Sequence, residues 1–111
     1  MARRVYDEAT FKTTTLNGVQ YKLFYIGVLA KRLNRTPTTI REWENKGIIP
    51  ASEFRDKFGK RLYTEEQIEA IAKCAKRDRI HIGRSFALTN FSVHCHRQFE
   101  LLHKKYFGGD K

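Results

Sequence analysis

Two short amphipathic stretches that follow each other closely constrain the fold of this chain more than any other feature. In the first, apolar residues recur at intervals of three and four, the period of one helix face: Ile26, Leu29, Ala30 and Leu33. Asn34 is a residue type that can end this helix. Thr36 then provides an N-cap for a second helix, Pro37 suits its first position, and Gly47 suits the residue after its end. The spacing predicts two helices joined by a tight turn.

A turn signal precedes these helices. Asn17 and Gly18 both tolerate positive φ, as the two-residue turn of a β-hairpin requires. The Thr13–Thr15 run before them is β-branched and favours a strand. Such a turn predicts three facing pairs: Leu16 with Val19, Thr14 with Tyr21, and Lys12 with Leu23. Because an isolated hairpin is marginally stable in water, we expect its Tyr21 and Leu23 face to pack on the rest of the domain.

The residues after the second helix indicate a basic loop or small β-wing, followed by a third helix. Residues 51–61 are polar, basic and interrupted by Gly59. Thr64 and Gln67 have the spacing of a capping box, in which two side chains cap the same helix start reciprocally. The apolar face of the helix that follows consists of Ile68, Ile71, Ala72 and Ala75.

A last helix is predicted after residues 80–88, which show no clear period. Thr89 or Asn90 can cap this helix, and Gly108 can end it. Its apolar stripe recurs at intervals of three and four: Phe91, Cys95, Phe99, Leu102 and Tyr106. The stripe either folds back on the domain core or forms a two-fold interface between copies. We favour self-association, because a domain of this size would leave so long an aromatic stripe in need of cover.

The charge balance points to a polyanionic partner. Lys and Arg number 22 against 12 Asp and Glu, which gives a formal net charge of +10, a large excess for 13.1 kDa. No run approaches the roughly 18 consecutive apolar residues of a membrane helix. The basic start, Met1–Arg4, leads into polar residues rather than an apolar stretch, and two cysteines are too few for a disulfide framework. We therefore expect a cytoplasmic protein with no membrane partner.

The sequence offers no set of residues that predicts catalysis or metal binding. The glycines at 108–109 do not open a helix, so they form no phosphate-binding loop, and no nucleophile with its base can be assigned. His94, Cys95 and His96 are close together, but no Cys-x-x-Cys or His-x₃-His spacing appears. We expect Cys74 and Cys95 to be small buried residues, and we expect neither enzyme activity nor a cofactor or metal.

The N-terminal turn of the second helix carries groups suited to DNA. Thr38, Thr39 and Arg41 occupy this turn and its outer side, and hydroxyl and guanidinium groups reach phosphates and base edges. Six basic residues lie in the unit formed by this helix and the wing: Arg41, Lys46, Arg55, Lys57, Lys60 and Arg61. They form either a solvated surface or one that faces phosphates, and their number favours phosphates.

Trp43 has two interpretations. Its indole N–H is a single fixed donor that suits a DNA backbone contact. The ring suits equally well a core position in which it holds the second helix against the wing.

Five stretches in this order resemble the winged helix-turn-helix of the mercury-resistance-regulator (MerR) superfamily: Tyr25–Ala30, Thr36–Glu44, Gly47–Pro50, Arg55 and Gly59–Tyr63. The resemblance covers roughly residues 24–78. Two departures argue against a small-molecule-sensing role. Glu42, Trp43 and Glu44 stand where the family usually has Tyr-Tyr-Glu, which looks more like the excisionase-type and phage branch. We also expect no long C-terminal coiled coil or effector domain of the kind that the family's transcription factors carry.

The resemblance implies roles for individual residues. Thr39 and Arg41 would face the DNA, with Arg41 reading a base edge or a phosphate. Arg61 would contact the DNA backbone alongside Arg55 and Lys60. Together with the residues above, the candidate DNA-binding set is Thr38, Thr39, Arg41, Trp43, Lys46, Arg55, Lys57, Lys60, Arg61 and Tyr63.

The combined prediction is a mainly α, winged helix-turn-helix (MerR-like) protein with an N-terminal β-hairpin and a C-terminal helix. We expect a basic tail over residues 1–9, the hairpin and DNA-binding domain over 10–79, and a connector and C-terminal helix for packing or dimerisation over 80–111. The expected function is non-catalytic binding of double-stranded DNA, as a small phage-like or mobile-element transcriptional regulator in the host cytoplasm or nucleoid. One alternative is an accessory factor for recombination or genome packaging, such as an excisionase or small packaging subunit. Another is an interaction module for an acidic protein partner.

Overall fold

The first two strands form the hairpin that the turn signal predicts. In the computed structural model, which describes residues 6, 9–77 and 90–108, β1 (Phe11–Leu16) and β2 (Val19–Tyr25) pair antiparallel. Asn17 and Gly18 have φ of 51° and 81°, so both turn residues are left-handed. The three predicted facing pairs are confirmed: Leu16 with Val19, Thr14 with Tyr21, and Lys12 with Leu23.

The hairpin is part of a larger antiparallel sheet. β3 (Phe54–Arg55) pairs with β4 (Arg61–Thr64), and β4 also pairs with β2, so the strand order is β1-β2-β4-β3. Tyr25 lies opposite Leu62 in this register. Local patterns predicted the hairpin and the basic loop separately, and they did not predict the pairing of β2 with β4.

The next two helices have the predicted ends. α2 (Ile26–Leu33) is ended by Asn34, whose φ of 58° is left-handed. α3 (Pro37–Asn45) begins after Thr36, whose hydroxyl accepts a hydrogen bond from the N–H of Thr39 at 3.2 Å. The two helices and their short connection form the helix-turn-helix that the sequence predicts.

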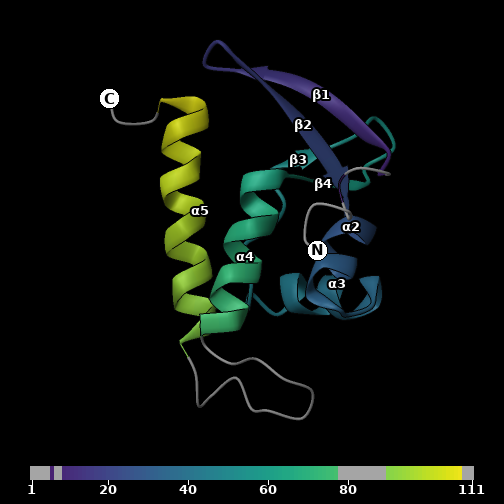
Figure 1. Ribbon diagram of the computed structural model, residues 1–111, viewed down its shortest axis with the longest axis vertical. Helices are drawn as coiled ribbons and strands as arrows, with labels where there is room; N and C mark the ends of the chain where they lie inside the picture. Colours follow the sequence, from purple (N-terminus) through teal and green to yellow (C-terminus); the bar gives the residue numbers. More distant parts are fainter. Residues whose placement is uncertain (1–5, 7–8, 78–89, 109–111) are drawn as a thin grey trace.

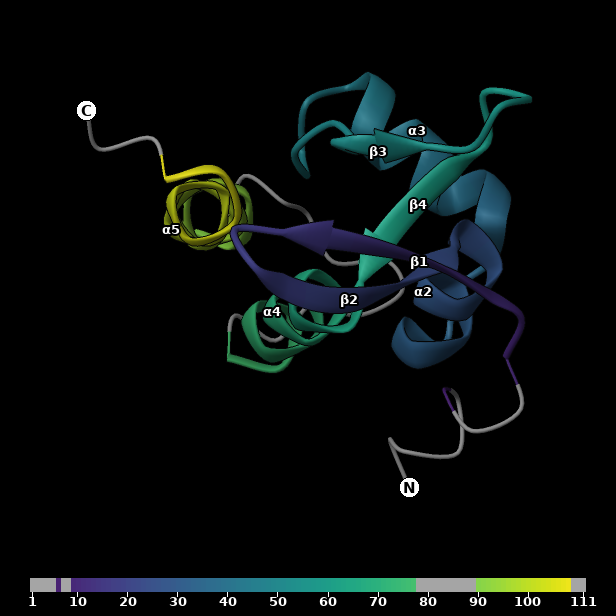
Figure 2. The ribbon, with the colours of Figure 1, turned by 90° about the horizontal axis from the view of Figure 1, so that it is seen from above.

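The last two described helices lie side by side (Figures 1 and 2). α4 (Glu65–Arg77) begins with the predicted capping box: the N–H of Gln67 donates to the Thr64 hydroxyl, and the N–H of Thr64 donates to the Gln67 side chain, both at 3.0 Å. α5 (Phe91–Phe107) begins after Asn90, whose side chain makes no capping bond. In Figure 1, α2 and α3 lie on the opposite side of α4 from α5.

Both faces of the sheet are covered by helices. Phe24 and Tyr63, on one face, are 1% and 0% exposed and belong to the main core with residues of all four described helices. On the other face, the ring of Tyr106 from α5 lies 4.8 Å from that of Tyr21, and its hydroxyl is 2.6 Å from the Thr64 hydroxyl. The hairpin therefore packs on the rest of the chain, as its marginal stability predicts.

The apolar stripe of α5 is covered within the chain. Four of its residues are buried, Phe91, Cys95, Phe99 and Tyr106, and Leu102 is half-buried. Phe91 meets Trp43 edge-on, with ring centroids 5.6 Å apart. The helix predicted within 80–111 thus shares a core with the segment 10–79. Cys74 is also buried, so both cysteines have the predicted burial.

One residue of the expected N-terminal tail, Tyr6, packs against the folded domain. The ring of Tyr6 lies 5.1 Å from that of Phe24, and its hydroxyl donates to Glu69 of α4. The same carboxylate accepts two hydrogen bonds from Arg32 of α2, at 2.8 and 3.0 Å. Residues 1–5 and 80–89, which include the predicted cap Thr89, lie outside the described residues.

The described residues form four helices and one four-stranded antiparallel sheet. None of the described helices is both long and apolar enough to cross a membrane.

Candidate nucleic-acid interface

The outward face of α3 carries polar side chains at helical spacing. Thr38, Arg41 and Asn45 are exposed at intervals of three and four, whereas Ile40 and Trp43 point into the core. This face is free of the apolar residues that would direct it against another part of the chain. Its donors and acceptors are therefore available to a partner outside the protein.

The loop of residues 56–60, between β3 and β4, is held in one shape by a carboxylate. Asp56 accepts hydrogen bonds from the N–H groups of Phe58 and Lys60, both at 2.9 Å, and from the Tyr25 hydroxyl at 3.1 Å. Desolvation opposes ionisation of Asp56, but the hydrogen bonds from Lys60 and Phe58 outweigh it and lower the pKa of the carboxyl. Gly59, with φ of 83°, closes the turn. The loop is thus preorganised, and it leaves the ring of Phe58 76% exposed.

The outward face of α3 and this loop line a common hollow. Arg41 contributes from α3, Phe58, Gly59 and Lys60 from the loop, and Tyr25, Ile26 and Arg61 from the neighbouring elements. We call this the α3-side hollow. Three residues of the predicted DNA-binding set, Arg41, Lys60 and Arg61, are thereby brought to one place on the surface, although α3 is far in the sequence from the loop and β4.

Arg61, which also lines the α3-side hollow, forms an ion pair with Glu44 of α3. The side chain of Glu44 is only 4% exposed, and that of Arg61 is 21% exposed. Glu44 also accepts the N–H of Ser52. These contacts fix β4 against α3 and set the position of the loop, and they leave less of the Arg61 charge for a phosphate.

Trp43 and Tyr63 lie in the core rather than on the surface. Trp43 is 7% exposed and packs on Phe91, and the guanidinium of Arg35 lies 5.9 Å from its ring centroid. Tyr63 is fully buried, and burial together with the nearby charge of Glu44 raises the pKa of its hydroxyl. Of the two interpretations of Trp43, the core position is the one observed, and the ring contact that shows it is with Phe91 of α5, whereas the prediction was that the ring holds the second helix against the wing.

The remaining basic residues of the predicted DNA-binding set are exposed, but they do not all lie near the α3-side hollow. Arg55 donates to the carbonyl of Gly59 at 3.0 Å, and the Lys57 ammonium lies 5.3 Å from the ring centroid of Phe58, so both stay close to the loop. Lys46 is the C-cap residue of α3, five positions beyond Arg41 and about 7 Å further along the helix axis. It is therefore set apart from the α3-side hollow.

The comparison with protein families agrees with this arrangement. Residues 24–76 match the family described as MerR HTH family regulatory protein. This segment is a MerR-family helix-turn-helix. No curated protein and no solved structure was found that matches the chain. We call residues 24–76 the MerR segment. It runs from the end of β2 through α4, so β1, most of β2 and α5 lie outside it.

Sequence reasoning missed two residues of the candidate interface. Asn45 extends the exposed face of the MerR segment's α3, and the helical interval from Thr38 and Arg41 could have identified it. Phe58 projects from the loop, and an aromatic residue between lysines in a polar stretch was a signal for an exposed contact.

Within the described ranges, no three His, Cys, Asp or Glu side chains are grouped so that they could hold a metal ion. His96 lies 2.9 Å from the carbonyl of Gly47, and His103 lies 2.6 Å from the Glu53 carboxylate. These two histidines connect α5 to the segment between α3 and β3.

Proposed function

We propose that the protein is a non-catalytic, double-stranded DNA-binding protein of the winged helix-turn-helix type. In this proposal α3 lies in the major groove and the loop 56–60 is the wing, which meets the adjacent DNA backbone. The α3-side hollow carries the proposal, because it joins a guanidinium on the outward face of α3 to a lysine of the loop. The formal net charge of +10 supports a polyanion as the partner.

We propose further that the protein is a small regulator of the phage-like or mobile-element kind. The MerR match supports regulation, and the MerR segment occupies most of the described core. Such a role places the protein with the nucleoid in the cytoplasm. Palindromic binding sites would support the regulator, whereas tandem sites beside attachment or packaging sequences would support an accessory role in recombination or packaging.

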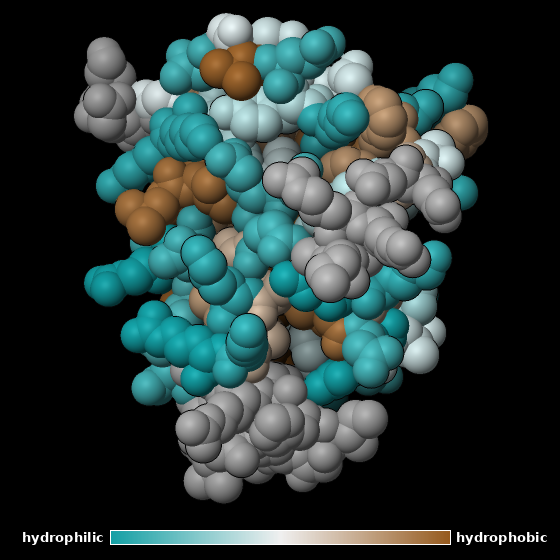
Figure 3. All heavy atoms as spheres, in the orientation of Figure 1, coloured by the Kyte–Doolittle hydropathy of each residue, from teal (hydrophilic) through white to brown (hydrophobic). Residues whose placement is uncertain are grey.

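A palindromic DNA site is bound by two copies of a protein, and α5 offers a surface through which two copies can pair. Its predicted stripe is buried, but Val93 and Leu101 are 66% and 56% exposed and lie eight positions apart, close to the same face. Figure 3 shows an exposed hydrophobic patch on the side of the molecule where Figure 1 draws α5. We propose that copies pair through this outward face of α5 rather than through the buried stripe.

The test of DNA binding is its dependence on salt. If about five phosphates are neutralised, log affinity should fall against log salt concentration with a slope of about −4 to −5. Fluorescence polarisation with a labelled duplex measures this slope, and an acidic peptide of matched length serves as the control ligand. A nearly flat slope with the duplex, or tight binding to the peptide alone, would overturn the proposal in favour of an acidic protein partner.

A further inference from the structure

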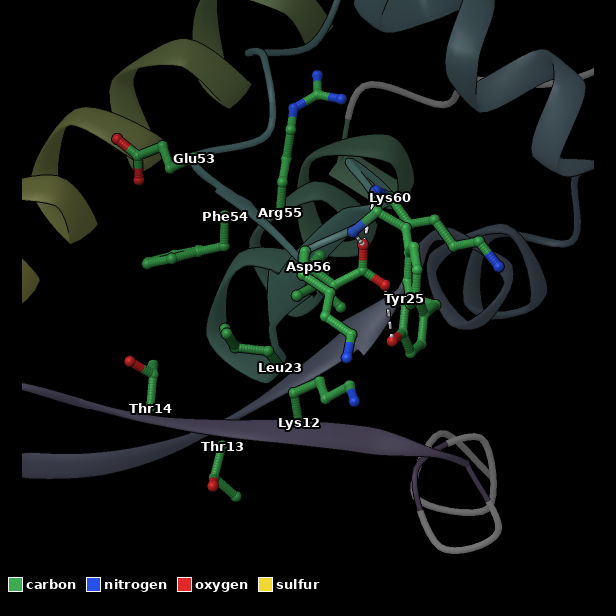
Figure 4. A pocket seen from close by; sticks show the side chains of 13 residues that line it. Lys12, Thr13, Thr14, Leu23, Tyr25, Glu53, Phe54, Arg55, Asp56 and Lys60 are labelled. Carbon is green, nitrogen blue, oxygen red and sulfur yellow. Dashed lines mark hydrogen bonds between the residues drawn. The ribbon is translucent and has the colours of Figure 1, made fainter.

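A second hollow lies on the other side of the loop 56–60, between the loop and the N-terminal hairpin (Figure 4). Lys12, Thr13 and Thr14 of β1 line it on one side, and Arg55, Asp56 and Lys57 line it on the other. Leu23, Tyr25, Phe54 and Leu62 also contribute to its lining. We call it the hairpin-side hollow. It involves β1, which lies outside the MerR segment.

The loop therefore separates two hollows with different walls. Tyr25, Phe58 and Lys60 line both of them. Arg41 lines the α3-side hollow, whereas Lys12 and Lys57 line the hairpin-side hollow. Cationic side chains thus lie on each side of a narrow, rigid projection.

The acidic side chains of the hairpin-side hollow are engaged by other groups. Asp56 accepts the hydrogen bonds that hold the loop. Glu53 contacts His103 at 2.6 Å and accepts from Gln67 at 3.1 Å. Within the part of the chain that the structure describes, neither Lys12 nor Lys57 forms an ion pair. The charges in this hollow that remain open to a ligand are therefore mainly positive.

The arrangement matches the shape of one DNA groove. The minor groove is about 6 Å wide and is bordered by two phosphate backbones, one from each strand. A loop that enters it has one backbone on each side. A cationic hollow on each side of the loop supplies counter-charges for both backbones, and the hydroxyl of Thr14, which lies on the loop side of β1 in Figure 4, is a further donor to phosphate.

We infer that the hairpin-side hollow binds the phosphates of the second DNA strand, which makes β1 a third DNA-contacting element beside α3 and the loop. This inference rests on the proposed function. Lys12 is its central residue, because its side chain extends from β1 towards the loop in Figure 4.

The hairpin provides a matched control for Lys12. Lys22 lies on the paired strand and is also exposed, but it is opposite Thr13 rather than Lys12, and so lies on the other face of the hairpin. Its ammonium lies 4.7 Å from the ring centroid of Phe11. Lys12→Ala and Lys22→Ala remove the same charge from the same hairpin, and they differ in the face affected. Circular dichroism shows that both variants are folded before binding is compared.

The experiment measures affinity for specific and scrambled duplexes at a series of salt concentrations. We expect Lys12→Ala to weaken binding to both duplexes alike and to make the salt slope shallower by about one unit. In hydroxyl-radical footprinting we expect Lys12→Ala to lose protection on one strand across the minor groove. Lys22→Ala should match the wild type in both measurements.

Two other outcomes are distinguishable. If the wild type binds duplex DNA with a steep salt slope, but Lys12→Ala and Lys22→Ala have the same slope and footprint, the inference is wrong and the proposed function stands. If the wild type itself has a flat slope and leaves no footprint, the proposed function fails and the inference fails with it.

Discussion

Arg41 and Arg61 were both predicted to contact DNA, Arg41 from the second helix and Arg61 from the wing, and the structure gives them different surroundings. Arg41 is exposed on the outward face of α3, and among the described residues no acidic side chain forms an ion pair with it. Arg61 is held by the buried carboxylate of Glu44. At the scale of single residues, a basic side chain is therefore a stronger candidate for DNA contact when its charge is not already paired with a carboxylate of the protein.

Replacement of Arg41 tests sequence readout. Arg41→Ala should cost about 1–3 kcal/mol on the specific site and flatten the preference among sequences, because a guanidinium in the major groove forms paired bonds to guanine. Affinities for specific and scrambled duplexes at two salt concentrations measure this. Equal losses on both duplexes would make Arg41 a phosphate contact, and sequence choice would then depend on Thr38, Thr39, Asn45 or DNA shape.

Replacement of Arg61 should act mainly on stability. Arg61→Ala leaves the carboxylate of Glu44 buried without its ionic partner, and breaking such a pair costs about 3 kcal/mol. Urea denaturation measures the change in the free energy of unfolding, with exposed Lys60→Ala as the control. A variant of unchanged stability whose salt slope is shallower by one unit would show instead that Arg61 binds a phosphate.

Sequence reasoning at this scale identified the residue types but not which of them are buried. Trp43 was named with the DNA-binding residues because its indole N–H is a fixed donor, and Tyr63 because it belongs to the stretch that resembles the wing of the MerR superfamily. Their burial depends on partners distant in the sequence, such as Phe91 for Trp43. The polar end of an aromatic ring suits a core edge and an interface equally well, so no local pattern separates the two positions.

At the scale of elements, local chemistry predicts the helix ends well. The caps at Asn34, Thr36 and Thr64 each depend on residues within a few positions, and each is present. The pairing of β2 with β4 was not predicted, because strand partners distant in the sequence leave no local signal. The cover of α5 was misjudged for the same reason, since the residues that bury its stripe come from several other elements.

The outward face of α5 gives a test of pairing between copies. Leu101→Asp should leave the fold intact, because the side chain is 56% exposed, and it should shift the protein towards monomers by disrupting the proposed interface. Sedimentation velocity measures the mass in solution. Phe99→Asp is the contrasting variant, because it places a charge in the core and should unfold the chain. A Leu101→Asp protein with the same mass as the wild type would exclude this face as the interface.

At the scale of the whole molecule, one carboxylate connects three distant parts of the chain. Glu69 of α4 accepts hydrogen bonds from Arg32 of α2 and from Tyr6 near the N-terminus. The hydrogen bond from Arg32 is the main cause of its lowered pKa, and it outweighs the opposing effect of desolvation. Because the pKa is lowered by folding, the ionised group stabilises the native state above its usual value of 4.5.

This linkage predicts how stability depends on pH. Glu69→Gln should lower the unfolding midpoint near neutral pH, and the difference from the wild type should shrink as pH falls through the folded pKa of Glu69, below 4.5. Thermal unfolding followed by circular dichroism from pH 7 downwards measures it, with exposed Glu42→Gln as the control. A difference that stays constant down to the lowest pH would show that the charge of Glu69 does not stabilise the fold.

The pairing of β2 with β4 also has a consequence for how the chain folds during synthesis. The hairpin is synthesised early, and its turn can form without any later residue. The strand that pairs with the other edge of β2 is β4, which follows α2, α3 and β3 in the sequence. At a synthesis rate of about 5–20 residues per second, β4 is made a few seconds after β2, and the edge of β2 stays unpaired during that time. An open strand edge is a template for pairing with another chain. Fragments that end before β4, whether they arise from stalled translation or from cleavage, should therefore aggregate through β2.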